Sequence, residues 1–326
     1  MTFVKYFLLN DVEIVKREEH FDDKALFAVW SFYHFSTTSD ILGVGVIKRR
    51  RGWRKVPFVE VEKGRLYYEI NGEGRWLVLI HGAWASHEWW RCQVPELSHN
   101  YRVLSLDVRG HGQSSPLEEP DSVDNFAKDL ETLLQKVGAA EVALVGWSMG
   151  GIISMQYYLD NPSRVKTLVL VATRGHRNPK MKLQLWLQQL QTRLSLMMDF
   201  ADYEAVIYQD QVEKEVRSML SPATPKEVID WIMTDLTNNP RRNFFEVAKS
   251  LWNWEAGDRL AAINVPTLIM VGEEDNRTPP HFSRLLHEKI PNSKLVVVEN
   301  CGHYLLLERP DIVNAEIIRF LKNAGY

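Results

Sequence analysis

The fold of this chain is decided by the stretch Val142-Ala143-Leu144-Val145-Gly146-Trp147-Ser148-Met149-Gly150-Gly151. Its four leading apolar residues predict a buried strand, and the G-x-S-x-G sequence behind them is typical of a sharp turn from a strand into a helix. Such a turn exposes the hydroxyl of Ser148, and it needs Gly146 and Gly150 because a Cβ at either position would approach the neighbouring backbone too closely. The stretch therefore predicts a nucleophilic serine at the end of a strand.

Apolar and amphipathic runs alternate along the chain from Val56 onward. Continuous apolar strands that alternate with helices are typical of a parallel sheet covered on both faces. The pattern predicts strands at 56–62, 65–70, 76–80, 103–108, 142–145, 167–171, 267–271 and 294–298, and helices at 122–137, 152–159, 280–290 and 310–322. We therefore expect an α/β fold with a mainly parallel sheet of about eight strands, helices on both faces and an inserted helical lid.

The lid is predicted where the strand pattern disappears, between residues 173 and 258. Helical periodicity covers 181–198 and 204–220, and the capping sequence Thr224-Pro225-Lys226-Glu227 predicts a further helix. An all-helical block inside an α/β domain is typical of a cover over the active edge of the sheet. The predicted domains are an N-terminal extension of unknown role at 1–55, a core at 56–173 and 259–326, and the lid at 174–258.

The composition is that of an ordinary globular protein, with 45% hydrophobic and 25% charged residues among 326. A net charge of −3 argues against nucleic acid as a partner. Cys92 and Cys301 are too few for a disulfide framework, so we expect a reducing, cytoplasmic compartment. Six cations within residues 48–55 could contact an anionic membrane surface, but a solvated linker is the favoured interpretation.

A serine nucleophile needs a base, and His303 is the best placed of the ten histidines. It lies between the last predicted strand and the last predicted helix. The imidazole needs an acid in turn, and Asp275 follows the preceding strand, with Glu274 as the alternative. The remaining histidines that we expect to be solvated are His20, His34, His87, His99, His176, His281 and His287.

An oxyanion site is predicted where His81-Gly82-Ala83-Trp84 follows the strand at 76–80. The amides of Ala83 and Met149 are expected to bind the developing negative charge, and one such donor contributes about 3 kcal/mol to the chemical step. His81 is expected to brace this loop. The substrate-binding residues that we predict are Trp84, Trp147 and Tyr304.

From about Pro57 to the C-terminus the chain resembles the α/β-hydrolases of the lidded serine esterase and lactonase type. The matching stretches are His81-Gly82, Asp107 to Ser114, Gly146 to Gly151, Val265-Pro266-Thr267, Gly272 to Asp275 and Gly302-His303. The resemblance implies a serine hydrolase but says little about its substrate. The aromatic residues of the predicted lid favour an apolar pocket, so we expect cleavage of carboxylic esters or thioesters of an apolar acyl group through an acyl-enzyme. Family members with dehalogenase or epoxide hydrolase activity carry aspartate where this chain has Ser148, which argues against both activities.

Two other functions remain open at this point. A lactone or carbon–carbon bond hydrolase would use the same Ser148, Asp275 and His303, with Tyr304 and a cation such as Arg241 or Arg242 as the residues to examine. A small-ligand receptor of the same fold would keep these residues but turn over slowly. No metal ion or organic cofactor is expected, since the sequence has no phosphate-binding loop and no dinucleotide fingerprint.

Overall fold

The computed structural model describes residues 57–117, 119, 121–177, 212–238, 244–252 and 254–326, together with two short strands nearer the N-terminus. The chain divides into two compact units, residues 1–54 and 55–326. In the first unit, β1 (Val4–Lys5) pairs antiparallel with β2 (Arg17–Glu18). The cationic run at 48–55, the predicted helix at 181–198 and Arg241 and Arg242 lie outside the described residues.

The second unit is built on an eight-stranded sheet with the order β10-β9-β8-β7-β5-β6-β4-β3. The strands β5 to β10 run parallel, and β4 pairs antiparallel with both β3 and β6. Their bounds are β3 Phe58–Val61, β4 Gly64–Asn71, β5 Trp76–Ile80, β6 Arg102–Leu106, β7 Val142–Trp147, β8 Val165–Val171, β9 Thr267–Gly272 and β10 Ser293–Val298. The predicted α/β class and the mainly parallel eight-stranded sheet are confirmed.

The central strands are apolar throughout because both faces of the sheet are covered. Every residue of β7 and β9 is buried. Alternate residues of a strand point to opposite faces, so Leu144 belongs to one hydrophobic core while Ala143 and Val145 belong to the other. The two cores fix the sheet between two layers of helices.

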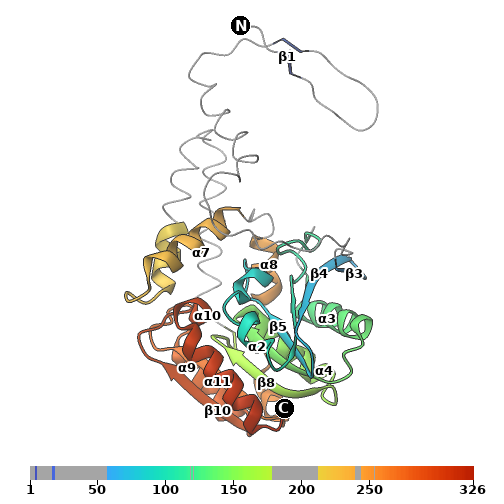
Figure 1. Cartoon of the computed structure of the whole chain (residues 1–326), viewed down its shortest axis with the longest axis vertical. Helices are drawn as coiled ribbons and strands as arrows, with labels where there is room; N and C mark the ends of the chain where they lie inside the picture. The colour runs from blue at the N-terminus through green and yellow to red at the C-terminus, as the bar shows by residue number, and fades with distance from the viewer. Residues whose placement is uncertain are drawn as a thin grey trace. The chain divides into compact units, whose positions relative to one another are not determined.

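Helices cover both faces of the sheet (Figure 1). The first core includes residues of α3 (Val123–Val137), α4 (Met149–Asp160) and α9 (Pro280–Lys289), and the second includes residues of α11 (Pro310–Asn323). Capping explains the bounds of α3. The Ser122 hydroxyl accepts the Asn125 N–H at 3.1 Å, and Gly138 ends the helix with a φ of 75°.

Between β8 and β9, all regular secondary structure in the described residues is helical. Residues 212–219 are helical, and α7 (Lys226–Asn238) and α8 (Phe244–Trp252) follow, before the 3-10 helix η2 (Gly257–Ala262). We call residues 212–252 the helical insertion. The sequence did not predict three short elements: η1 (His87–Trp90), α2 (Val94–Leu97) and α10 (Leu305–Glu308).

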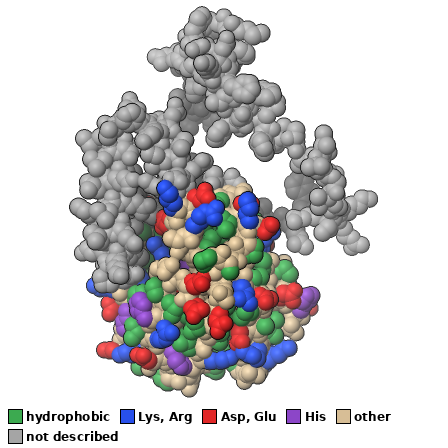
Figure 2. All heavy atoms as spheres, turned by 90° about the vertical axis from the view of Figure 1, so that its left-hand side faces the viewer, with side chains coloured by type: hydrophobic (Ala, Val, Ile, Leu, Met, Phe, Trp, Pro, Cys, Tyr) green, Lys and Arg blue, Asp and Glu red, His purple; other side chains and the backbone are tan. Residues whose placement is uncertain are grey.

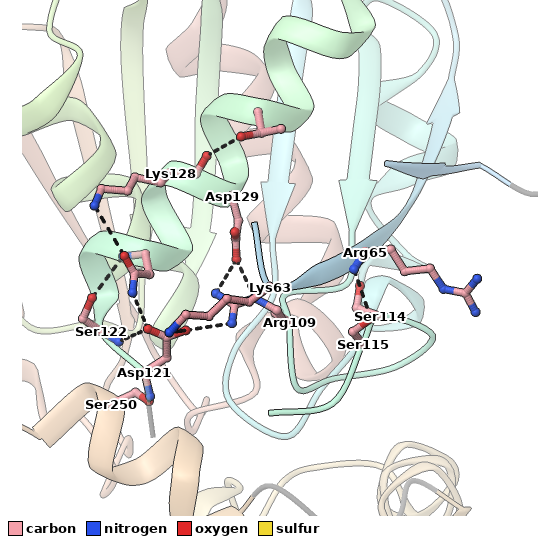
Figure 3. A network of polar contacts seen from close by, with 12 residues as sticks. Lys63, Arg65, Arg109, Ser114, Ser115, Asp121, Ser122, Lys128, Asp129 and Ser250 are labelled. Carbon is pink, nitrogen blue, oxygen red and sulfur yellow. Dashed lines mark hydrogen bonds and ion pairs between the residues drawn. The ribbon is translucent and has the colours of Figure 1, made fainter. Parts of the chain in front are cut away.

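A buried arginine ties the helical insertion to the core (Figure 3). The Arg109 guanidinium donates to Asp129 of α3 at 2.8 Å and to Asp121 at 2.7 Å. The backbone N–H of Asp121 donates to the Ser250 hydroxyl of α8 at 2.9 Å. Because Arg109 is only 2% exposed and pairs with two carboxylates, this network fixes the segment after β6 against two helices.

The surface of the second unit mixes charges of both signs. Figure 2 shows acidic, basic and hydrophobic side chains interspersed over one face of the described residues. Within the described part of the chain, no helix combines the length and apolarity needed to span a bilayer.

Candidate active site

Ser148 lies on the corner where β7 turns into α4. Its φ of 53° and ψ of −112° are strained for a residue with a side chain. The N–H of Ser148 donates to Val171 O at 2.9 Å, and its carbonyl accepts the Thr173 hydroxyl at 2.7 Å. These bonds hold the strained corner in place, so the hydroxyl stands above the carboxyl end of β7.

The two glycines of the corner leave room for backbone contacts. A Cβ on Gly146 would overlap the carbonyl of Gly150, and a Cβ on Gly150 would overlap the carbonyl of Ile80. The turn is therefore as tight as the G-x-S-x-G sequence predicts.

Ser148, His303 and Asp275 come together at the carboxyl edge of the sheet. His303 Nε2 lies 3.2 Å from Ser148 Oγ, and His303 Nδ1 lies 2.9 Å from Asp275 Oδ2. The three side chains come from the loops after β7, β10 and β9, and His303 and Asp275 are 4% and 1% exposed. It is Asp275, and not the alternative Glu274, whose carboxylate bonds the imidazole.

The surroundings of Asp275 keep its carboxyl group ionised. Oδ1 accepts the N–H groups of Arg277 and Thr278, both at 2.8 Å, and Oδ2 also accepts the Thr278 hydroxyl at 2.8 Å. Burial raises the pKa of Asp275, but the His303 ring and these donors outweigh it and hold the pKa below its ordinary value. The Nδ1 of His303 therefore carries a proton, which leaves Nε2 free to accept one from Ser148.

The loop after β5 lies against the nucleophile. A Cβ on Gly82 would come within 3.2 Å of the Ser148 Cβ and 2.8 Å of the Trp147 ring. His81 braces this loop, since its Nδ1 donates to Gly82 O at 2.6 Å and its Nε2 accepts the Val108 N–H at 3.0 Å. Burial lowers the pKa of His81, which keeps it in the neutral form that these two bonds require. Ala83, whose amide is predicted to bind the oxyanion, follows Gly82 in this loop.

A small hollow, partly open to solvent, adjoins this loop. Its lining residues are Ala83, Trp84, Trp89, Glu215, Val216, Met219, Leu236 and Tyr304. Two of the three predicted substrate-binding residues, Trp84 and Tyr304, are therefore part of this wall. Trp84 has a φ of 62°, unusual for so bulky a residue, and the Arg277 guanidinium lies 5.4 Å from its ring centroid.

Trp147, the third residue predicted to bind substrate, does not line the hollow. It is 2% exposed, stacks on Trp89 with 5.1 Å between ring centroids, and donates from Nε1 to the His303 carbonyl at 3.0 Å. The strand pattern makes Trp147 the last buried residue of β7, and its size fills the space under the histidine loop. These contacts place Trp147 against the His303 backbone, and its contact with substrate stays a prediction.

His87 corrects one prediction. We expected a solvated side chain, but His87 is 7% exposed and its Nδ1 lies 2.8 Å from Asp107 Oδ1. Asp107 also accepts the backbone N–H groups of His87 and Gln113. The spacing of His87 and Asp107 in the sequence does not predict this pair. His87 lies in η1, for which the sequence has no recognisable pattern, and Asp107 follows β6.

Comparison with known proteins places the chain in a family. Residues 75–310 match the model of the alpha/beta hydrolase fold. A 2-hydroxy-6-oxononadienedioate/2-hydroxy-6-oxononatrienedioate hydrolase from Pseudomonas putida is 30% identical over 82% of this chain and 96% of its own. A pimeloyl-[acyl-carrier protein] methyl ester esterase from Aliivibrio salmonicida is 28% identical over 79% of this chain and 96% of its own.

A solved structure agrees with the sequence relatives. A thermophilic esterase from Thermogutta terrifontis superposes with a TM-score of 0.70 at 25% identity, over 81% of this chain and 95% of that one. These relatives are hydrolases, and they share with this chain nearly their whole length. The chain thus belongs to the α/β hydrolase fold family and is an enzyme of that class.

Proposed function

We propose that this enzyme hydrolyses carboxylic esters or thioesters of an apolar acyl group through an acyl-enzyme intermediate. The observation that carries the proposal is the hydrogen-bonded line from Ser148 Oγ through His303 to Asp275, with distances of 3.2 and 2.9 Å. A hydroxyl in such a line can lose its proton to the imidazole as it attacks a carbonyl carbon.

In the first half of the reaction, Ser148 Oγ bonds to the carbonyl carbon while His303 Nε2 takes the hydroxyl proton. The amides of Ala83 and Met149 bind the resulting oxyanion. His303 then gives its proton to the departing alkoxide or thiolate, and the alcohol or thiol leaves the acyl group on Ser148.

In the second half, water takes the place of the alcohol. His303 removes a proton from the water as its oxygen attacks the acyl carbon, and returns that proton to Ser148 Oγ as the carboxylic acid leaves. Asp275 stays ionised throughout and stabilises the imidazolium that forms twice per turnover.

The substrate class follows from the hollow beside Ala83. Aromatic and aliphatic side chains make up most of its wall, which favours an apolar acyl group. The helical insertion contributes Glu215, Val216, Met219 and Leu236 to this wall, so we assign it the role of a lid over the substrate. Cys92 and Cys301 are both free, which supports a cytoplasmic site of action.

A carbon–carbon bond hydrolase is the second candidate, favoured by the 30% identity to the Pseudomonas putida enzyme. The named substrates of that relative are dioates, which carry two carboxylates. The described residues that line the hollow include one carboxylate, Glu215, and no cation, and the Arg277 guanidinium beside them pairs with Glu215 at 3.9 Å. Like charges repel, so the charge of this wall favours the ester over a dicarboxylate.

The proposal is tested with p-nitrophenyl esters of graded acyl chain length. We expect rapid release of p-nitrophenol that rises with chain length and is abolished in Ser148→Ala, while the exposed-serine control Ser163→Ala keeps the wild-type rate. A single burst without turnover would favour a slow-turnover receptor, and cleavage of a dienedioate but of no ester would favour the carbon–carbon bond hydrolase.

A further inference from the structure

Glu308, the last residue of α10, has a buried carboxylate that collects four hydrogen bonds. Oε2 accepts the N–H of Gly302 at 3.1 Å, the N–H of Ser221 at 2.9 Å and the hydroxyl of Thr224 at 2.7 Å. Oε1 accepts the N–H of Tyr304 at 3.0 Å. The side chain is 7% exposed, so these donors replace the water that the carboxylate has lost.

The four donors belong to two segments that are far apart in the sequence. Gly302 and Tyr304 flank His303, which carries the imidazole that bonds Ser148. Ser221 and Thr224 lie between the helix at 212–219 and α7, within the helical insertion. One carboxylate therefore holds the histidine loop and the helical insertion together.

The same two segments also touch directly. The N–H of His303 donates to Met219 O at 2.7 Å. Gly302 packs so closely on this segment that a Cβ there would overlap the Met219 carbonyl and come within 2.8 Å of the Leu220 Cα. The backbone at Gly302 and His303 thus rests directly on the helical insertion.

Substrate would reach this connection from the hollow. Val216 and Met219 line the hollow, and they belong to the turns of helix that lead into the Glu308 contacts. A group that pushes on Met219 therefore pushes on the backbone acceptor of the His303 N–H. Met219 thus contacts both the hollow and the backbone of the base.

We propose that Glu308 is a positioning residue that sets His303 for proton transfer and couples its position to the helical insertion. The inference rests on the proposed serine hydrolase function. It assigns to one carboxylate the task of bringing His303 Nε2 to Ser148 Oγ, and it makes acylation sensitive to what fills the hollow.

The test compares Glu308→Gln with Thr224→Val. A glutamine offers one carbonyl oxygen and turns an amide donor toward N–H groups that need an acceptor. We expect kcat on a short ester to fall about 10- to 100-fold with KM little changed, because displaced catalytic groups lose rate and not ground-state binding. Thr224→Val removes one of the two bonds that the helical insertion donates to Glu308, while the Ser221 N–H bond stays, and it should lower kcat about two- to tenfold.

Two matched controls separate positioning from general damage. Glu316→Gln makes the same change in α11, where the carboxylate bonds Lys294 on the surface. Thr234→Val makes the same change in α7, where the hydroxyl bonds the Asp230 carbonyl. Both should keep the wild-type kcat.

Two readouts decide the result. One is the rate at which a fluorophosphonate labels Ser148, and the other is the far-downfield proton resonance of the His303 N–H bonded to Asp275. In Glu308→Gln we expect slower labelling and a shifted or broadened resonance, and in Thr224→Val a smaller change of the same kind. The unfolding temperatures of the variants should not correlate with the labelling rates or with the resonance.

Wild-type kcat and an unchanged resonance in a folded Glu308→Gln would overturn the inference. If wild-type enzyme neither labels nor hydrolyses esters, the proposed function fails instead, and the resonance alone then decides whether Glu308 positions His303. If Glu308→Gln does not fold, Thr224→Val with wild-type kcat and resonance would overturn the coupling.

Discussion

The indole of Trp147 and the backbone of His303 are joined by a hydrogen bond of 3.0 Å. The residue before the nucleophile thereby holds the loop of the base, so one corner of the chain orients both partners of the first proton transfer.

Trp147→Phe removes this bond and keeps an aromatic ring on Trp89. We expect kcat to fall about fivefold with KM unchanged, since a net hydrogen bond is worth about 1 kcal/mol. The control is Trp90→Phe, because the buried Trp90 indole N–H has no partner among the described residues. Equal kcat values for the two variants would contradict the role assigned to Trp147.

Asp275→Asn tests which acid supports the base. The amide can donate where the carboxylate accepted, which favours the wrong tautomer of His303, and we expect kcat to fall about 10 000-fold. Glu274→Gln changes the neighbouring carboxylate and should keep most of the activity. The measurement is kcat of both variants on one ester. A larger loss of kcat in Glu274→Gln than in Asp275→Asn would show that Glu274 supports the base.

His87 and Asp107 predict how stability depends on pH. Burial lowers the pKa of His87, but the bond and charge of Asp107 outweigh it and raise the pKa above 6.5. Burial raises the pKa of Asp107, but His87 outweighs it and lowers the pKa below 3.8. The contribution of His87 to the free energy of unfolding is complete below about pH 6.5, and it is lost as the pH rises through the raised pKa of His87. The aspartate contribution is complete above about pH 4 and is lost as pH falls.

The pair should therefore stabilise the fold most between about pH 4 and 6.5. We expect His87→Gln to lower the free energy of unfolding by about 1.5–3 kcal/mol at pH 6 and by less at pH 9. Urea unfolding at both pH values measures this, with the exposed His99→Gln as the control. The prediction is wrong if the wild type and His87→Gln show the same change in free energy from pH 6 to 9.

Glu215 should select against negatively charged substrates. It forms an ion pair with Arg277 at 3.9 Å, and both side chains are partly exposed, so this pair balances the charge only weakly. Glu215→Gln should raise kcat/KM about two- to fivefold for an ester with a carboxylate on its acyl chain, and leave a neutral ester unchanged. Glu213→Gln, two residues away and paired with Arg217 at 2.7 Å, is the control. An equal change for both esters would show that Glu215 does not select by charge.

The sequence predicted the parts of the site that have a strong local signal. Gly146 and Gly150 fix a turn by their lack of a Cβ, and the apolar strands fix which loops meet at the carboxyl edge. Ser148, Asp275 and His303 could be chosen on that basis, because parallel strands bring their ends together.

The missed features depend on contacts between distant segments. Thr224 stands where the sequence predicts the start of a helix, and α7 begins at Lys226, but no local pattern indicates that the Thr224 hydroxyl donates to Glu308. The bond from the Trp147 indole to the His303 carbonyl was also not predicted. Nothing in a strand sequence says which side of the sheet the histidine loop will cover. Side-chain partners of this kind are set by tertiary packing and not by local pattern.

The most direct test of the account is to trap the acyl-enzyme. Wild-type protein is mixed with a slowly released p-nitrophenyl ester, quenched in acid within the first turnovers and digested for mass spectrometry. We expect one acyl group on the peptide that contains Ser148, and none in Ser148→Ala. Ester hydrolysis that continues at the wild-type rate in Ser148→Ala, or an acyl group on another residue, would contradict it.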